Sequence, residues 1–172
     1  MNYLKDYKSF NEDFTIEDSD ASDVKAAKEK LNDIKKQLSN YKSQKGSLDS
    51  LYNTDESVDN DKLKKIIGDE NKNPFLLSYS SVCSLEKKIK DLKNKRNNKS
   101  IELSELKDKL NDADDSSKEN IEDRIDKVEE QISNIDDDIN EANKKLPDIK
   151  KQHEEKMKSV EDDMKKWISK IQ

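Results

Sequence analysis

Apolar residues recur every three or four positions along two stretches of the chain, residues 82–110, with one polar gap between Leu92 and Leu103, and residues 121–146. A spacing that averages 3.5 residues keeps one stripe of a helix facing a partner helix, as in a coiled coil. The pattern therefore predicts two long amphipathic helices, at about residues 81–111 and 117–146. Their apolar seam positions are Val82, Leu85, Ile89, Leu92, Leu103, Leu106 and Leu110 in the first helix, and Ile121, Ile125, Val128, Ile132, Ile135, Ile139, Ala142 and Leu146 in the second.

A polar break, Asn-Asp-Ala-Asp-Asp-Ser-Ser, separates the two stretches at residues 111–117. Such side chains compete for backbone hydrogen bonds and favour turns and helix caps. Ser116, with Glu119 three residues later, matches a capping box that opens the second helix. Folding the chain near residue 114 places the apolar positions of both stretches opposite each other, so we expect an antiparallel hairpin. One continuous helix through the break is the alternative.

The charges of the two predicted helices are opposite. Residues 75–111 hold nine Lys/Arg and five Asp/Glu, a net charge of +4, whereas residues 112–149 hold five Lys/Arg and fourteen Asp/Glu, a net charge of −9. Opposite flanking charges favour this pairing over self-pairing of either helix. Arg96 and Lys99 occupy two seam positions, and we expect acidic partners for them in the second helix, among Glu129, Glu130 and Asp136. A phosphate-contact patch is the alternative for this basic pair.

Three further segments complete the predicted architecture. Residues 24–52 keep the heptad pattern and predict a third long helix. Residues 53–80 are a predicted connector with one short helix that ends at Gly68. Residues 147–171 continue an apolar stripe after Pro147, which either kinks or restarts the helix, and this stripe has residues 24–52 or another copy of the chain as its candidate partner.

These elements define an all-α fold, an elongated antiparallel coiled-coil hairpin or three-helix bundle. Residues 1–23 form a short aromatic and acidic leader, and residues 24–172 form a single helical domain.

Composition agrees with a thin apolar seam. Of 172 residues, 30% are hydrophobic and 43% are charged, against about 45–50% and about 25% in ordinary globular domains.

The net charge of −6 gives no reason to expect specific nucleic-acid binding. No apolar run reaches the length of a membrane span. A single Cys fits a reducing, cytoplasmic location.

The residues that carry catalysis or bind metals are scarce. One His (His153) and one Cys (Cys83) cannot complete a zinc site made from nitrogen and sulfur ligands. Residues 112–123 share carboxylates with a calcium loop, but Ser117 stands where that loop needs Gly and Glu119 stands where it needs an apolar residue. We therefore expect no enzyme activity, no cofactor and no metal.

Two apolar clusters are candidate partner-binding surfaces, although each also fits a packing role. The first is the densest apolar cluster of the chain, and the second is the C-terminal stripe. A membrane-surface helix is a further alternative for the stripe, because lysines accompany it. The candidate residues are Phe75, Leu76, Leu77 and Tyr79 in the first cluster, and Met157, Val160, Met164, Trp167 and Ile171 in the second.

The leader places Tyr7 and Phe10 three residues apart, with Glu12 shortly after. Over about a dozen residues it resembles the N-terminal targeting peptide of internal, prohead-core proteins of T-even-like tailed phages. The resemblance implies cleavage by a prohead protease after a Glu, here Glu12 or Glu17, and a location inside the virion. Phe10-Asn11-Glu12 fits the family's cleavage pattern poorly, and Glu17 departs from it too because the apolar Ile16 directly precedes it.

Together these features predict a structural or scaffold protein that associates through its helices with itself or with another helical protein. Association with itself would produce an oligomer. The alternative is an adaptor or inhibitor that binds one protein through residues 75–79 or through the stripe around Trp167.

Overall fold

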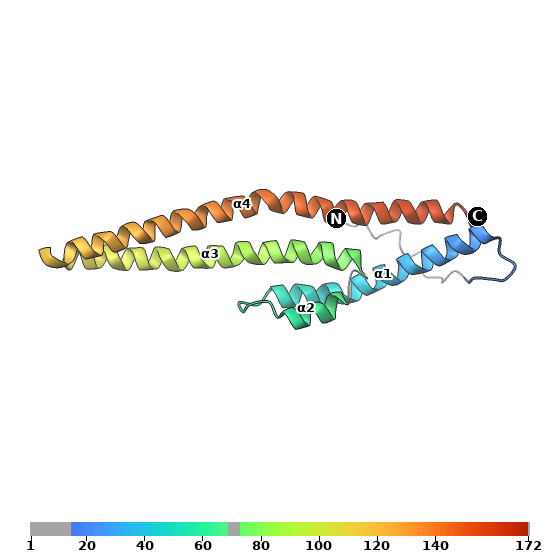
Figure 1. Ribbon diagram of the computed structural model, residues 1–172, viewed down its shortest axis with the longest axis horizontal. Helices are drawn as coiled ribbons and strands as arrows, with labels where there is room; N and C mark the ends of the chain where they lie inside the picture. Colours follow the sequence, from blue (N-terminus) through green and yellow to red (C-terminus); the bar gives the residue numbers. More distant parts are fainter. Residues whose placement is uncertain (1–14, 69–72, 172) are drawn as a thin grey trace. The chain divides into compact units, whose positions relative to one another are not determined.

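The computed structural model describes residues 15–68 and 73–171, and this part of the chain contains four helices and no strand. They are α1 (Ser22–Tyr52), α2 (Asn60–Ile67), α3 (Pro74–Asp112) and α4 (Asp115–Ile168) (Figure 1). The all-α prediction is therefore confirmed. The chain forms two compact units: unit 1 comprises residues 1–82 and 149–172, and unit 2 comprises residues 83–148.

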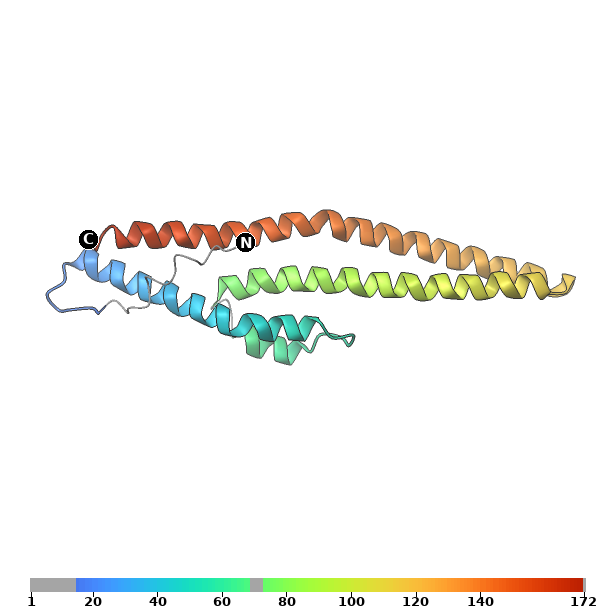
Figure 2. The same ribbon diagram turned by 180° about the vertical axis from the view of Figure 1, so that it is seen from behind.

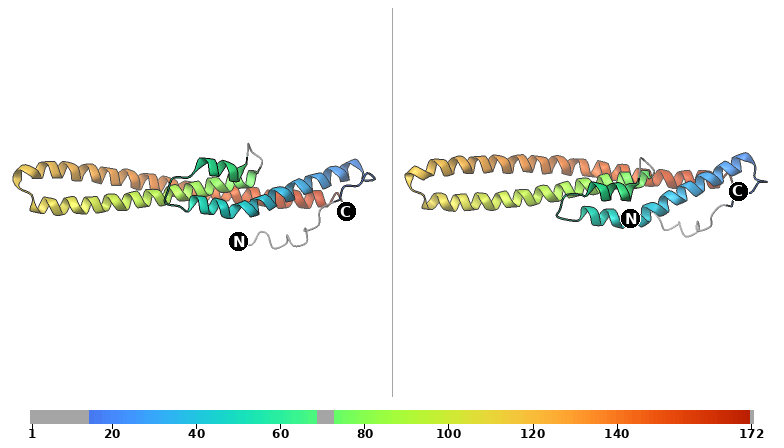
Figure 3. Two further views of the ribbon diagram at one scale, coloured as in Figure 1. Left: turned by 90° about the horizontal axis from the view of Figure 1, so that it is seen from below. Right: turned by 60° about the horizontal axis from the view of Figure 1, so that its bottom comes forward.

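Unit 2 is the predicted antiparallel hairpin. Helix α3 ends at Asp112 and α4 begins at Asp115, so the chain reverses where the polar break lies, and the alternative of one continuous helix is wrong. Figures 2 and 3 show the two arms of this unit side by side. Near the turn, a buried cluster joins the arms, with Leu103, Leu110, Ile121 and Ile132 packed against its buried members Leu106, Ile125 and Val128.

Ion pairs cross the hairpin as the charge pattern predicts. The Nε of Arg96 lies 2.7 Å from Oδ1 of Asp136, and the Nζ of Lys107 lies 2.9 Å from Oε1 of Glu129. Asp136 is thus the acidic partner of Arg96, whereas Lys99 bonds to Glu102 within its own helix. Exposed ion pairs contribute little stability individually, so these contacts select the partner and register while the apolar seam stabilises the hairpin.

Asp114, not Ser116, caps the start of α4. Its Oδ1 accepts a hydrogen bond from the backbone N–H of Ser117 at 2.9 Å and from the hydroxyl of Ser116 at 2.8 Å. The predicted capping box is therefore wrong by two residues. Hydrogen bonds from Ser116 and Ser117 hold the pKa of the Asp114 carboxyl below its ordinary 3.8.

We expect Asp114→Ala to lower the urea midpoint of the hairpin, because it leaves a backbone N–H of the first turn without its acceptor. Ser116→Ala is the matched control and should leave the midpoint close to wild type. The contribution of Asp114 should be present above pH 3.8 and be lost as the pH falls through the lowered pKa. A larger effect from Ser116→Ala, measured by circular dichroism at neutral pH, would contradict this cap.

Unit 1 combines α1 and α2 with residues 74–82 of α3 and residues 149–168 of α4. The C-terminal stripe packs in the same unit as α1, since the hydroxyl of Tyr41 lies 3.2 Å from Nε2 of His153. The sequence analysis named residues 24–52 or another copy of the chain as the candidate partner of this stripe, and in the structure the stripe contacts α1. The buried hydrophobic residues of this unit include Ala27, Leu31, Leu38, Tyr41, Leu48, Tyr52, Phe75, Leu76 and Met164.

Two helix boundaries differ from the sequence prediction. Helix α3 begins at Pro74 rather than near residue 81, because Asn73 caps its first turn and Pro suits the first helical position. Helix α4 continues through Pro147 as one helix of 54 residues instead of two. A proline there removes one backbone donor, and Asn143, whose carbonyl would accept that bond, is an exposed residue.

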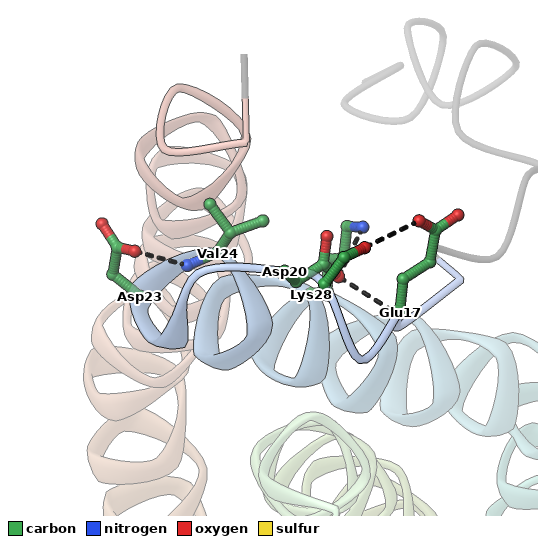
Figure 4. A network of polar contacts seen from close by, with 6 residues as sticks. Glu17, Asp20, Asp23, Val24 and Lys28 are labelled. Carbon is green, nitrogen blue, oxygen red and sulfur yellow. Dashed lines mark hydrogen bonds and ion pairs between the residues drawn. The ribbon is translucent and has the colours of Figure 1, made fainter.

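No side chain caps the start of α1, and the segment just before this helix is instead fixed by hydrogen bonds of Asp20. Asp20 accepts the backbone N–H of Glu17 at 3.0 Å and the ammonium of Lys28 at 2.8 Å (Figure 4). The bond from Lys28, together with that from Glu17, holds the pKa of Asp20 below 3.8. The short helix α2 ends where predicted, at Gly68, whose φ of 83° favours glycine.

No helix of the described residues is long and apolar enough to cross a membrane.

Candidate functional site

A polar and aromatic cluster surrounds His153 in unit 1. It brings together three segments that are far apart in the sequence. Helix α1 contributes three side chains at four-residue intervals, which share one helix face. The first turns of α3 contribute two more side chains, and α4 contributes His153. The members are Tyr41, Lys45 and Asp49 from α1, Ser78 and Tyr79 from α3, and His153 from α4.

Both ring nitrogens of His153 are hydrogen-bonded. Nδ1 lies 2.8 Å from Oγ of Ser78, and Nε2 lies 3.2 Å from the hydroxyl of Tyr41. The hydroxyl of Ser78 donates to the carbonyl of Phe75 at 3.1 Å. Because that proton is used, we assign the imidazole proton to Nδ1, which donates to Ser78, so that Nε2 accepts from Tyr41.

Tyr79 joins α3 to α1 through a second set of bonds. Its hydroxyl donates to Oδ1 of Asp49 at 2.6 Å and accepts from the ammonium of Lys45 at 2.7 Å. That ammonium also lies 3.0 Å from Oδ2 of Asp49 and 4.3 Å from the centre of the Tyr79 ring, a cation–π distance. Burial acts to raise the pKa of Asp49, but the bonds from Tyr79 and Lys45 outweigh it and hold the pKa below 3.8.

The rings of the cluster pack against one another. Tyr41 meets Phe75 and Tyr79 edge-on, with ring centres 6.3 and 5.9 Å apart, and His153 lies 5.4 Å from Tyr79. Edge-to-face packing is the favoured arrangement for aromatic rings. The cluster therefore combines apolar packing with directed hydrogen bonds between three segments.

The environment of His153 favours its neutral form. Burial is the main cause that lowers its pKa below 6.5. The charges of Lys156 and Lys45 lower it further, and the charge of Glu154 acts in the opposite direction.

The pair of Ser78 and His153 resembles a nucleophile and its base in spacing, but the surroundings do not suit acyl transfer. Ser78 lies inside α3, where backbone N–H groups bond to carbonyls one turn earlier and are not free to stabilise an oxyanion. Its own proton points to the Phe75 carbonyl rather than to the ring. The arrangement suits a role in holding helices together. No group of three or more His, Cys, Asp or Glu in residues 15–68 and 73–171 is placed to hold a metal ion.

No protein-family model, curated protein or solved structure matches this chain.

The first predicted partner-binding cluster is largely internal. Phe75 and Leu76 are 4% and 0% exposed, so both side chains pack internally in this structure, and their contact with a partner stays a prediction. The reason is that α3 begins at Pro74, which places both residues in a helix that packs within unit 1. Leu77 and Tyr79 are half-buried, and the hydroxyl of Tyr79 is bonded to Asp49.

The second predicted cluster is covered in part. Met164 is 4% exposed, so its side chain packs internally in this structure. Trp167 is half-buried, with the ammonium of Lys170 4.4 Å from its ring centre. The partner-binding role of the remaining half-buried members stays a prediction; they are Met157, Val160, Trp167 and Ile171.

Three of the four predicted leader residues, Tyr7, Phe10 and Glu12, lie outside the described residues. The fourth, Glu17, is exposed, and its carbonyl accepts the N–H of Asp20 at 3.1 Å in a tight turn. Cys83 is buried.

The sequence analysis did not reveal the cluster around His153. The available signal was the four-residue spacing of Tyr41, Lys45 and Asp49 on one face of a predicted helix. That spacing does not reveal which distant segment faces it.

Proposed function

We propose that this chain is a non-enzymatic structural or scaffold protein that acts through helix-mediated association with another copy or with another helical protein. One observation carries the proposal: half of the apolar seam of unit 2 is only partly covered. Of the fourteen apolar seam residues between positions 83 and 148, seven are buried and seven are half-buried. The half-buried ones are Leu85, Leu92, Leu103, Leu110, Ile121, Ile132 and Leu146.

A partly covered seam supports association because a two-helix coiled coil leaves the edges of its core layers accessible. A third amphipathic helix gains stability by burying those edges. The charged flanks of the arms, with a net charge of +4 over residues 75–111 and −9 over residues 112–149, would then select the partner and its orientation.

We expect the full chain to self-associate as its concentration rises, with a mass above the 20.0 kDa of one chain in sedimentation equilibrium. Leu92→Gln should weaken the association, since it places an amide at a partly covered seam position. Ile101→Gln is the matched control, because Ile101 lies off the seam and is 53% exposed. Circular dichroism of both variants checks that the hairpin is retained.

A monomer at every concentration would contradict self-association and favour the adaptor alternative. In that alternative the chain binds one protein through residues 75–79 or through the stripe around Trp167, and the stripe is tested first because Phe75 and Leu76 are internal. Trp167→Ala should then abolish capture of the partner while Ile101→Ala retains it. If Trp167→Ala changes neither self-association nor partner capture, the stripe has no binding role.

A narrower version of the proposal is a capsid-internal, prohead-core component of a tailed phage, located in the virion rather than free in the cytoplasm. The resemblance of the leader, at Tyr7, Phe10 and Glu12, is what supports it. The intact mass of the protein from its native source tests it. A product that begins after Glu12 or Glu17 would support a processed sorting peptide, and a full-length mass would contradict one.

A further inference from the structure

We propose that His153 is a pH-sensitive latch of unit 1: its neutral ring holds α1, the first turns of α3 and the last turns of α4 together, and protonation of the ring loosens them. The latch is independent of the scaffold proposal, because every residue that forms it lies within one unit.

The hydrogen bonds assigned above use a neutral ring. Nδ1 donates to Ser78, whose own proton is directed to the carbonyl of Phe75 at 3.1 Å. Nε2 accepts the hydroxyl hydrogen of Tyr41 across 3.2 Å. Protonation adds a hydrogen to Nε2, so that both ring nitrogens carry one, and the new N–H is directed at the hydroxyl hydrogen of Tyr41. The Tyr41 side chain is buried, so its hydroxyl must reorient inside packed surroundings, and the contact between α1 and α4 weakens.

The charges around the ring also oppose protonation. Helix α1 contributes the ammonium of Lys45, and the carboxylate of Asp49 is engaged by that ammonium and by Tyr79. Helix α3 contributes the hydroxyls of Ser78 and Tyr79 and no charged group among the members of the cluster. Helix α4 contributes Lys156, which opposes a positive ring, and Glu154, which favours one. Burial adds the largest penalty, so the pKa of His153 lies below its ordinary 6.5.

The sign of the pH dependence follows from this lowered pKa. Between the folded pKa and 6.5, the unfolded chain binds a proton that the folded chain does not. The stabilising contribution of His153 is therefore complete above pH 6.5 and is lost as the pH falls toward the folded pKa. At pH 5.5, one unit below the ordinary value, the folding equilibrium of unit 1 weakens by at most about tenfold from this group.

The first test uses the fact that His153 is the only histidine in the chain. An NMR titration of the full protein then gives one set of imidazole resonances without assignment by mutagenesis. The expected midpoint lies below 6.5, and a midpoint at or above 6.5 would overturn the proposal.

The second test compares wild type with His153→Gln, whose amide donates and accepts hydrogen bonds but does not ionise. Hydrogen exchange is measured on unit 1 amides at pH 7.5 and 5.5 and corrected for the intrinsic exchange rate. We expect wild-type protection factors to fall by up to about tenfold and those of the variant to stay constant. An equal fall in both proteins would overturn the latch. If the variant does not fold, the wild-type titration decides the question.

Discussion

Replacing Leu106 with alanine is expected to lower the free energy of unfolding of the hairpin by about 2–5 kcal/mol. Leu106 is 2% exposed and forms the buried cluster of unit 2 with Ile125 and Val128. Truncation removes buried methyl groups and leaves a cavity that two packed helices only partly close. A two-helix hairpin has few core layers, so this loss is a large share of its stability.

The matched control for Leu106→Ala is Ile101→Ala, five residues earlier in the same helix and 53% exposed. We expect its effect to stay within about 0.5 kcal/mol. Urea unfolding followed by circular dichroism measures both variants, and hydrogen exchange assigns the loss to residues 83–148. Equal losses in the two variants would show that Leu106 does not form the core of the hairpin.

Replacing Asn73 with alanine is expected to cost about 2–4 kcal/mol, of which about 1 is the helix cap and about 1–3 a buried hydrogen bond. Asn73 is 1% exposed. Its Oδ1 accepts the backbone N–H groups of Phe75 and Leu76 at 3.1 and 3.2 Å, and its Nδ2 donates to the carbonyl of Gln37 at 2.8 Å. One side chain thus starts α3 and ties it to α1.

Asn73→Ser separates the two roles of this side chain. Serine caps a helix about as well as asparagine but is too short to reach the carbonyl of Gln37. We therefore expect Asn73→Ser to recover about 1 kcal/mol of the loss and to leave the remainder. Thermal and urea unfolding of both variants measure this difference. A serine variant as stable as wild type would mean that the bond to Gln37 contributes nothing, and one as unstable as the alanine variant would mean that the cap contributes nothing.

Asn73 and Asp114 show that the sequence locates turn-forming residues but does not identify the residue that caps the helix. Both sites hold turn-forming residues, Asn-Pro at 73–74 and Asp-Asp-Ser-Ser at 114–117. The sequence does not show which side chain caps the helix, since capping depends on backbone angles that several neighbouring residues are able to adopt. Ser116 was therefore expected where Asp114 acts, and residues 74–80 were assigned to a connector although they begin α3.

At Pro147 the local sequence favours a break in the helix, but the tertiary structure keeps the helix continuous. Locally, an interior proline costs about 3 kcal/mol and favours a break. The apolar stripe continues across it, with Leu146 and Ile149 both half-buried. Burial along 54 residues offsets the cost at one position, and α4 remains a single helix.

The sequence by itself determined the features of this protein that repeat along the chain. The 3.5-residue spacing of apolar side chains specified the long helices, the polar break specified the hairpin, and Gly68 ended the short helix, because each signal lies within a few consecutive residues. Only the tertiary structure decided which segments meet. Tyr41 and Ser78 reach His153 from 112 and 75 residues away. That packing, which no local pattern shows, leaves the ring half-buried, lowers its pKa and makes it a candidate switch.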